Sequence, residues 1–173
     1  MNILCYPNEI LRRKARMVTV FDDALGETAR QMLAVMSEAK GVGLAANQVG
    51  LQIRLCVFHI PEATANDIVM VNPDIVERQG SATIEEGCLS FPGIFIDVAR
   101  PERLKVRYQD LQGRERLAEV SGLMARAVQH EIDHLDGVLL VDKMNTVQRL
   151  AKRGALKMLE ARQERAKTAE RKP

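Results

Sequence analysis

Two histidines and a glutamate at short, regular spacing are the residues of this sequence best suited to chemistry. His130, Glu131 and His134 form the pattern HExxH. A spacing of four residues places both imidazoles on one face of a helix, where they can bind one metal ion through ring nitrogens. Glu131, directly after the first histidine, then lies where it can take a proton from a water molecule at the metal. The pattern predicts a hydrolytic metal site, with two helix histidines that bind no metal as the alternative.

Two histidines leave such a site one protein ligand short. The extended pattern of one class of zinc metalloproteases continues here as far as Gly137, but the position of its third histidine is Leu140. The glutamates further on lie in a basic C-terminal segment that we expect to be frayed, which makes it a poor place for a rigid ligand. The missing ligand is therefore expected upstream of the HExxH pattern.

Cys88 is the natural candidate for the third ligand. We interpret the other two cysteines, Cys5 and Cys56, as packing residues, because Cys56 for example lies within a hydrophobic run. Cys88 instead stands in a polar, turn-like segment, EEGCLS. Gly87 permits close approach of the backbone, and Glu86 offers a carboxylate that can orient a metal ligand. A buried cysteine with a structural role is the alternative.

A third segment of unusual composition is residues 41–50, GVGLAANQVG. Its glycines resemble a dinucleotide-binding fingerprint, but a helix is expected before them and a strand after them, the reverse of the order that this fingerprint needs. The small residues instead favour a backbone packed closely against a neighbouring group, with Gln48 as a fixed amide donor. An ordinary glycine-rich loop is the alternative.

Two helices are predicted around these segments. Asp22 can cap a helix over residues 24–40, with Gly41 at its C-terminal end. Ser121 can cap a second helix that carries the HExxH pattern and stops at Gly137. Serine and aspartate before a periodic apolar run and glycine after it are the usual start and stop signals.

Strands are predicted in the middle of the chain. Runs rich in β-branched residues at 53–60 and 68–76, and an alternating run at 104–108, have the composition of strands. Strands in the middle with helices on either side predict an α+β fold with a mostly antiparallel or mixed sheet, rather than alternating βαβ units. The length of 173 residues predicts one domain over residues 1–173.

Composition excludes several classes of protein. Hydrophobic residues make up 46% of the chain and charged residues 28%, which is ordinary globular usage and excludes a collagen-like or largely disordered chain. The scarcity of aromatic residues disfavours a base-stacking surface. No apolar run has the length of a membrane span, the N-terminus lacks the apolar core of a secretory signal, and three widely spaced cysteines suit a reducing compartment. We therefore expect a cytoplasmic protein without membrane contact.

The net charge of +2 hides an asymmetry. Residues 142–173 carry ten Lys and Arg against four Asp and Glu, a net of +6, whereas residues 1–141 carry fifteen against nineteen, a net of −4. We expect 142–173 to form an amphipathic helix, frayed after about residue 161, with an apolar stripe made of Val147, Leu150, Ala151, Gly154, Ala155, Met158 and Leu159. This helix either packs on the body with its basic face in solvent or docks on an anionic partner.

The three segments together resemble the peptide deformylases. The family motifs GxGxAAxQ, EGCLS and QHExDHLxG stand here in that order at residues 41–48, 86–90 and 129–137. The resemblance implies an α+β fold in which mixed, mostly antiparallel sheets surround a central HExxH helix. It also implies removal of the formyl group from the N-terminal formyl-methionine of newly synthesised polypeptides, with release of formate.

The resemblance also assigns roles to residues. It implies one metal ion, usually Fe²⁺ and replaceable by Zn²⁺ or another divalent ion, held by Cys88, His130 and His134. Catalytic roles fall to Glu131 as the proton carrier and to the Gln48 amide and the Leu89 N–H as oxyanion donors. Substrate binding falls to Val42, Gly43, Ile84, Gly87, Leu123 and Ala127. Its implied partners are the nascent formyl-methionyl chain and the ribosome, the latter through the basic C-terminal helix.

Two positions depart from the common family pattern. Phe95 stands where many bacterial members have a basic residue that helps to hold the substrate backbone. Arg126 stands on the metal-binding helix where an aliphatic residue is common, and it either faces solvent or lines the rim of the pocket. The rival interpretations are a metallopeptidase that has no need of Cys88 and a metal-stabilised binding module without catalysis.

Overall fold

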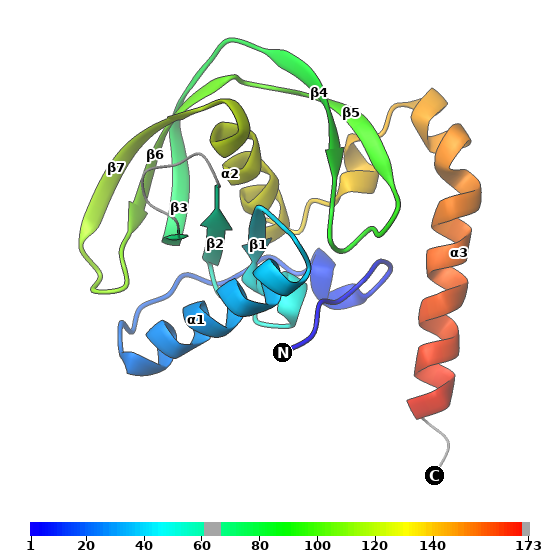
Figure 1. The fold of residues 1–173 in the computed structure, drawn as a ribbon, viewed down its shortest axis with the longest axis horizontal. Helices are drawn as coiled ribbons and strands as arrows, with labels where there is room; N and C mark the ends of the chain where they lie inside the picture. The colour runs from blue at the N-terminus through cyan, green and yellow to red at the C-terminus, as the bar shows by residue number, and fades with distance from the viewer. Residues whose placement is uncertain (61–66, 171–173) are drawn as a thin grey trace.

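The computed structural model describes residues 1–60 and 67–170 (Figure 1). Within these residues the chain alternates short helices, strands and three longer helices. In chain order the elements are η1 (Glu9–Arg12), α1 (Asp23–Glu38), β1 (Gly43–Ala45), η2 (Ala46–Val49), β2 (Leu55–His59), β3 (Asp67–Gln79), β4 (Ala82–Gly87), β5 (Phe95–Arg100), β6 (Arg103–Gln109), β7 (Glu115–Ser121), α2 (Gly122–Leu135), η3 (Leu140–Lys143) and α3 (Thr146–Glu170).

The strands form two separate antiparallel sheets. The larger sheet has the order β1-β2-β3-β6-β7, and β4 pairs only with β5. Every pairing between named strands is antiparallel, and a single isolated bridge, between Arg16 and Ile53, is parallel within the described residues. The predicted α+β class with mostly antiparallel sheets is confirmed.

The first predicted helix is present as α1. The Asp22 carboxylate accepts a hydrogen bond from the Leu25 N–H at 3.0 Å and so caps its first turn. Its apolar face is buried against β1 and β2, as Met32 and Met36 illustrate. The helix ends two residues earlier than expected, and Lys40 rather than Gly41 adopts the left-handed conformation, with φ of 56°.

Four strands lie outside the predicted set. The glycine-rich segment is not a loop throughout, since it contains β1 and η2. The segments of β4, β5 and β7 are short and rich in charged residues, so their apolar content alone did not indicate strands. The structure places Glu86 and Gly87 at the end of β4, and Cys88 directly follows it.

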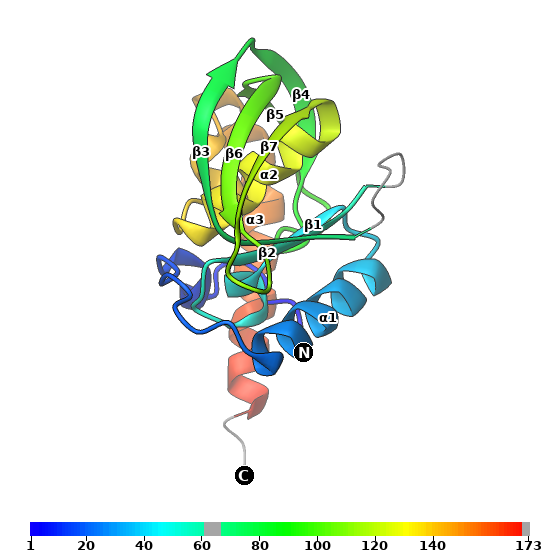
Figure 2. The ribbon, with the colours of Figure 1, turned by 90° about the vertical axis from the view of Figure 1, so that its left-hand side faces the viewer.

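Helix α2 occupies the centre of the molecule. Figures 1 and 2 show the larger sheet curving around one side of α2 and the β4–β5 hairpin arching over the other. Ala125, Val128 and Leu135 pack in one core cluster with Phe58 of β2 and Val106 of β6. Burying each large apolar side chain of this kind contributes about 1.5–3 kcal/mol, so the helix that carries HExxH is held firmly on the sheet.

The C-terminal helix α3 packs differently from the prediction. It begins at Thr146 rather than near residue 142, and it extends to Glu170, past the residue at which fraying was expected. Its buried contacts with the body come from Leu156 and Leu159. Three large members of the predicted stripe are instead exposed, at 76% for Val147, 70% for Leu150 and 74% for Met158.

This difference has a geometric cause. The apolar residues of α3 lie on two sides of the helix. One side carries Val147, Leu150 and Met158 and is exposed, and the other carries Leu156 and Leu159 and packs on the body. The helix stands at the side of the molecule, and its C-terminal half runs past the body (Figures 1 and 2). No helix among the described residues combines the length and apolarity needed to cross a membrane.

Candidate metal centre

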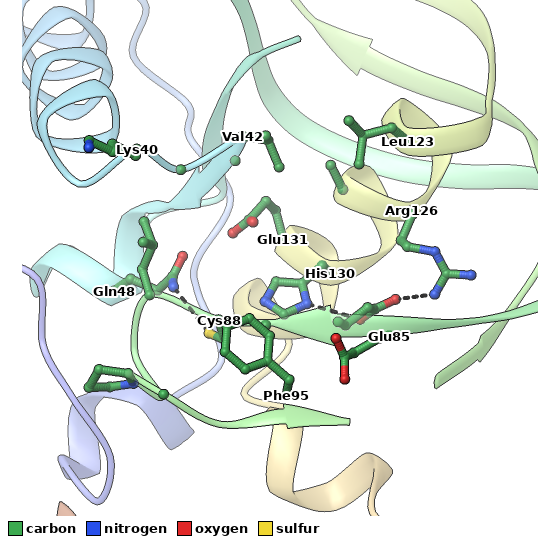
Figure 3. A pocket seen from close by; sticks show the side chains of 18 residues that line it. Lys40, Val42, Gln48, Glu85, Cys88, Phe95, Leu123, Arg126, His130 and Glu131 are labelled. Atoms are coloured by element: carbon green, nitrogen blue, oxygen red, sulfur yellow. Dashed lines mark hydrogen bonds and ion pairs between the residues drawn. The ribbon is translucent and has the colours of Figure 1, made fainter. Parts of the chain in front are cut away.

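The structure brings Cys88, His130 and His134 together. Figure 3 shows the first two of these residues, Cys88 and His130, beside each other at the cavity. Both histidines project from α2, and Cys88 comes from the turn after β4. The Cys88 Sγ lies 3.1 Å from the His134 Nε2, and the imidazole centroids are 5.0 Å apart. One ligand atom from each of the three residues lies within 4.8 Å of the other two.

These three side chains fit a divalent transition metal. Bonds of about 2.3 Å to sulfur and 2.0–2.1 Å to nitrogen bring tetrahedral ligand atoms to separations of this order. One thiolate and two imidazoles form a borderline-soft donor set, which suits Fe²⁺ or Zn²⁺ better than Mg²⁺ or Ca²⁺. The His134 ring is buried, and its Nδ1 has no hydrogen-bond partner within the described residues.

The two histidines differ in their electrostatic surroundings. Burial and the neighbouring His130 keep the pKa of His134 well below its ordinary value. Burial also disfavours a charge on His130, but Cys88 and Glu86 beside its ring outweigh that effect and raise its pKa well above the ordinary value. The negative groups around His130 therefore favour a positive charge on its ring.

Glu86 orients the His130 ring through its Nδ1. Its buried carboxylate accepts hydrogen bonds from the Arg100 Nε at 2.6 Å and Nη2 at 3.0 Å, and its Oε2 lies 3.2 Å from the His130 Nδ1. Burial opposes ionisation of Glu86, but the hydrogen bonds from His130 and Arg100 prevail and lower its pKa to about 2. An ionised carboxylate next to Nδ1 favours the tautomer in which Nδ1 carries the proton and donates it to Glu86. The Nε2 of His130 is then unprotonated and can bind a metal.

Glu131 lies beside the three candidate ligands with one oxygen unengaged. Its side chain is 4% exposed, and its Oε2 has no hydrogen-bond partner within the described residues. Burial raises the pKa of Glu131 to about 7, against the opposing charge of His130. A carboxylate with a pKa near neutrality is suited to accept and return a proton.

Gln48 is fixed as an amide donor by its own backbone turn. Its Oε1 accepts from the Ala45 N–H at 2.8 Å, so the Nε2 is the end that faces the site. The Nε2 lies 3.2 Å from the Ser90 Oγ and 3.7 Å from the Cys88 Sγ. The nearby Leu89 N–H donates to no acceptor among the described residues. Two donors thus lie next to the candidate metal ligands.

Comparison with known proteins places the chain in a family. A family model described as polypeptide deformylase matches residues 1–150. The peptide deformylase of Alkalilimnicola ehrlichii is 46% identical over 160 residues, which cover 92% of this chain and 90% of that one. The chain belongs to the peptide deformylase family. The peptide deformylase of Chromobacterium violaceum is 48% identical over 145 residues, which cover 84% of this chain and 87% of that one.

A solved member of the deformylase family has the same fold over nearly the whole chain. The crystal structure of peptide deformylase from Plasmodium falciparum has a TM-score of 0.90 and 38% identity, and the match covers 99% of this chain and 100% of that one. The family model itself ends at residue 150, so most of α3 lies beyond it. The expected family and fold are confirmed.

A cavity of about 510 Å³ opens beside the candidate ligands in this deformylase family member. Five of the six residues expected to bind substrate line it, namely Val42, Gly43, Gly87, Leu123 and Ala127. The sixth, Ile84, does not belong to the lining and is half exposed on β4. Ile84 and Glu86 are two residues apart, so their side chains project from the same side of β4. Of these two residues, Glu86 lines the cavity and Ile84 does not.

The cavity wall also contains residues that had no assigned role. Lys40 and Glu85 bring charges of opposite sign to it, and Phe95 covers the backbone of Gly87, where an added Cβ would lie 2.6 Å from the phenyl ring. Arg126 is buried in the wall, so it does not face solvent. Phe95 and Arg126 were marked by their departure from the family pattern, but Lys40 carried no such mark.

Proposed function

We propose that this chain is a metal-dependent hydrolase that removes the formyl group from the N-terminal formyl-methionine of newly synthesised polypeptides and releases formate. The observation that carries the proposal is the convergence of Cys88, His130 and His134 in a deformylase-family chain, with Cys88, His130 and Glu131 lining one cavity. We treat residues 1–173 as one catalytic domain, with residues 142–173 as a basic C-terminal extension.

Cys88, His130 and His134 would hold the metal, for which we propose Fe²⁺, with Zn²⁺ or another divalent ion as a replacement. When bound, the ion supplies Lewis acidity to the formyl oxygen and to a water molecule. The Glu86 carboxylate holds the His130 ring in the orientation that this role requires. Because both histidines belong to one packed helix, the site needs little rearrangement to accept the ion.

Proton transfer falls to Glu131. Its unengaged Oε2 accepts a proton from the attacking water and later delivers it to the leaving amine. The Gln48 Nε2 and the Leu89 N–H donate to the formyl oxygen as negative charge develops on it. A correctly aimed donor of this kind lowers the barrier by about 3–4 kcal/mol.

The substrate's methionine side chain would enter the apolar part of the cavity, beside Val42, Leu123 and Ala127. The extended peptide backbone would pair with strand edges near Val42 and Gly87, since both residues line the cavity and, among the described strands, β1 pairs only with β2 and β4 only with β5. At the cavity rim, Phe95 places an apolar ring where many bacterial members of the family have a basic side chain. The chain would therefore hold the peptide there by packing against this ring.

The experiment is formate release from a formyl-methionyl peptide by protein prepared anaerobically with Fe²⁺. Wild type should release formate, Glu131→Ala should lose that activity while keeping its metal, and an unformylated peptide should remain uncleaved. Full activity of Glu131→Ala, or cleavage of internal peptide bonds, would favour a different reaction.

We further propose that α3 contacts ribosomal RNA in the cytoplasm, where formylated chains are made. The helix is basic, stands at the side of the body and exposes Arg153 and Lys157. Contacts to phosphate weaken steeply with salt. Charge reversal at these two residues should weaken co-sedimentation with ribosomes, whereas unchanged, salt-independent binding would reject the contact.

A further inference from the structure

The proposed metal ligands come from two separately built parts of the fold. His130 and His134 belong to α2, which packs on the larger sheet, whereas Cys88 follows β4 of the separate β4–β5 hairpin. Within the described residues, no backbone hydrogen bond joins α2 to either strand of the hairpin. Side chains must therefore set the distance between the sulfur and the two imidazoles.

A buried group of charged side chains crosses between the two parts. We call Glu86, Arg100, Arg126 and Asp133 the bridging cluster. Arg100 of β5 binds Glu86 of β4 and also donates from Nη1 to Asp133 of α2 at 2.8 Å. Glu86, Arg100 and Arg126 are each less than 10% exposed, so water weakens these contacts little.

Arg126 makes the most extensive of these crossings. Its Nη1 donates to the Glu86 Oε1 and to the Val98 carbonyl, the latter at 3.0 Å, and its Nη2 donates to the Ala82 carbonyl at 3.0 Å. Ala82 belongs to β4 and Val98 to β5. One guanidinium on α2 therefore forms hydrogen bonds with both strands of the hairpin. Figure 3 shows the Arg126 side chain extending from the helix at the cavity wall.

Arg126 and His130 act on the same carboxylate from one helix face. They are four residues apart, so they lie one turn apart on the same side of α2. Arg126 and the Arg100 Nε both donate to the Oε1 of Glu86, and the Oε2, which also accepts from the Arg100 Nη2, lies against the Nδ1 of His130. Arg100 fixes the carboxylate from the hairpin side and Arg126 from the helix side, so the position of the Arg126 guanidinium contributes to where the carboxylate meets the imidazole.

We propose that Arg126 is a positioning residue for the metal centre: together with Arg100 it holds Glu86, and through Glu86 and the two hairpin carbonyls it helps to set the orientation of His130 and the distance of Cys88 from both histidines. This inference rests on the ligands assigned under the proposed function. A lysine cannot replace the guanidinium, because a single ammonium group cannot match its fixed, planar donor geometry. Loss of an outer partner of a metal ligand weakens metal binding about 10–100-fold.

The test uses Co²⁺ as the probe, with the full-length protein stripped of metal. Arg126→Lys keeps the charge, and Arg126→Met keeps much of the length without the charge. Co²⁺ affinity is measured by competition with a chelator, and the geometry is read from the thiolate-to-cobalt and d–d absorption bands. The matched control is Arg107→Lys, which alters an exposed arginine that binds Asp74 at 3.0 Å on the larger sheet.

The proposal predicts Co²⁺ binding about 10–100-fold weaker in Arg126→Lys, with shifted absorption bands, while Arg107→Lys matches wild type. Thermal unfolding of the metal-free proteins shows whether each variant is folded, and Arg126→Lys carries the test if Arg126→Met does not fold. Wild-type affinity and bands in folded Arg126→Lys would overturn the proposal. A wild type whose Co²⁺ spectrum lacks a Cys88-dependent thiolate band would overturn the ligand assignment, and the proposal with it.

A double-mutant comparison separates positioning from general stability. If Arg126 acts through Glu86, Arg126→Lys should weaken Co²⁺ binding much less in a Glu86→Gln background than in wild type. A merely structural arginine would produce the same fold-loss in both backgrounds. Equal losses would therefore overturn the route through Glu86.

Discussion

Gly43 leaves open the space that the Glu131 carboxylate occupies. A Cβ at residue 43 would lie 2.7 Å from the Oε1 of Glu131 and 3.1 Å from its Cγ, whereas ordinary contact begins at 3.4 Å. Gly43→Ala must therefore displace the carboxylate by about 0.7 Å, close to the 1 Å misplacement that costs an enzyme roughly a hundredfold in rate.

We predict that kcat for formate release falls by about 10–100-fold in Gly43→Ala. Metal content should be unchanged, because the clash involves Glu131 and none of the three proposed ligands. The assay is steady-state formate release at saturating formyl-methionyl peptide, which separates a loss of kcat from any weaker binding caused by the smaller cavity.

The matched control is Gly26→Ala in α1, where an added Cβ meets nothing within 4 Å. It should keep wild-type kcat and stabilise the fold by about 1 kcal/mol, because alanine favours the helix. A Gly43→Ala enzyme with intact metal and wild-type kcat would refute the reasoning, since Glu131 would then not need the position described.

Other changes probe the remaining groups. Gln48→Ala should lower kcat by about 10²–10³-fold with a smaller change in KM, because it removes one fixed donor; a change in KM alone would contradict this role. Cys88→Ala should lose most of its metal on dialysis, as metal analysis would show, and retention of a full equivalent would exclude the cysteine as a ligand. Leu156→Ala should lower the free energy of unfolding by about 2–3 kcal/mol in urea titrations. Val147→Ala should change it by less than about 0.5 kcal/mol, and the reverse order would contradict the observed packing of α3.

Local patterns were sufficient for the elements with strong periodicity. The helix that carries His130 and His134 and the buried strands β2 and β3 have clear apolar patterns. The helix ends were less well predicted, because the Ser121 side chain makes no capping hydrogen bond and α2 stops at Leu135, before Gly137. The i, i+4 spacing alone places the two imidazoles on one face. Periodicity could not indicate which apolar side of α3 packs, because Leu156 on one side and Leu150 on the other have equal hydrophobicity.

The hairpin and the bridging cluster had no comparable local signal. β4 presents mostly exposed residues, and its stability comes from pairing with β5 and from contacts with α2. The Arg126–Glu86 ion pair joins residues 40 positions apart, and nothing in either neighbourhood predicts it. The closeness of Cys88 to His134 likewise depends on tertiary packing. The lack of a downstream ligand and the polar setting beside Glu86 and Gly87 made Cys88 a candidate ligand, and only the family resemblance assigned it to the metal.

The central claim is that metal bound at Cys88, His130 and His134 supports removal of a formyl group. Its most direct test measures formate and free N-terminal amine from one formyl-methionyl peptide, using a single anaerobic preparation before and after metal stripping. The account predicts equal amounts of both products from the Fe²⁺-loaded protein, and restoration of the stripped protein by added Fe²⁺. Absence of formate from the loaded protein, or undiminished release from the stripped one, would contradict it.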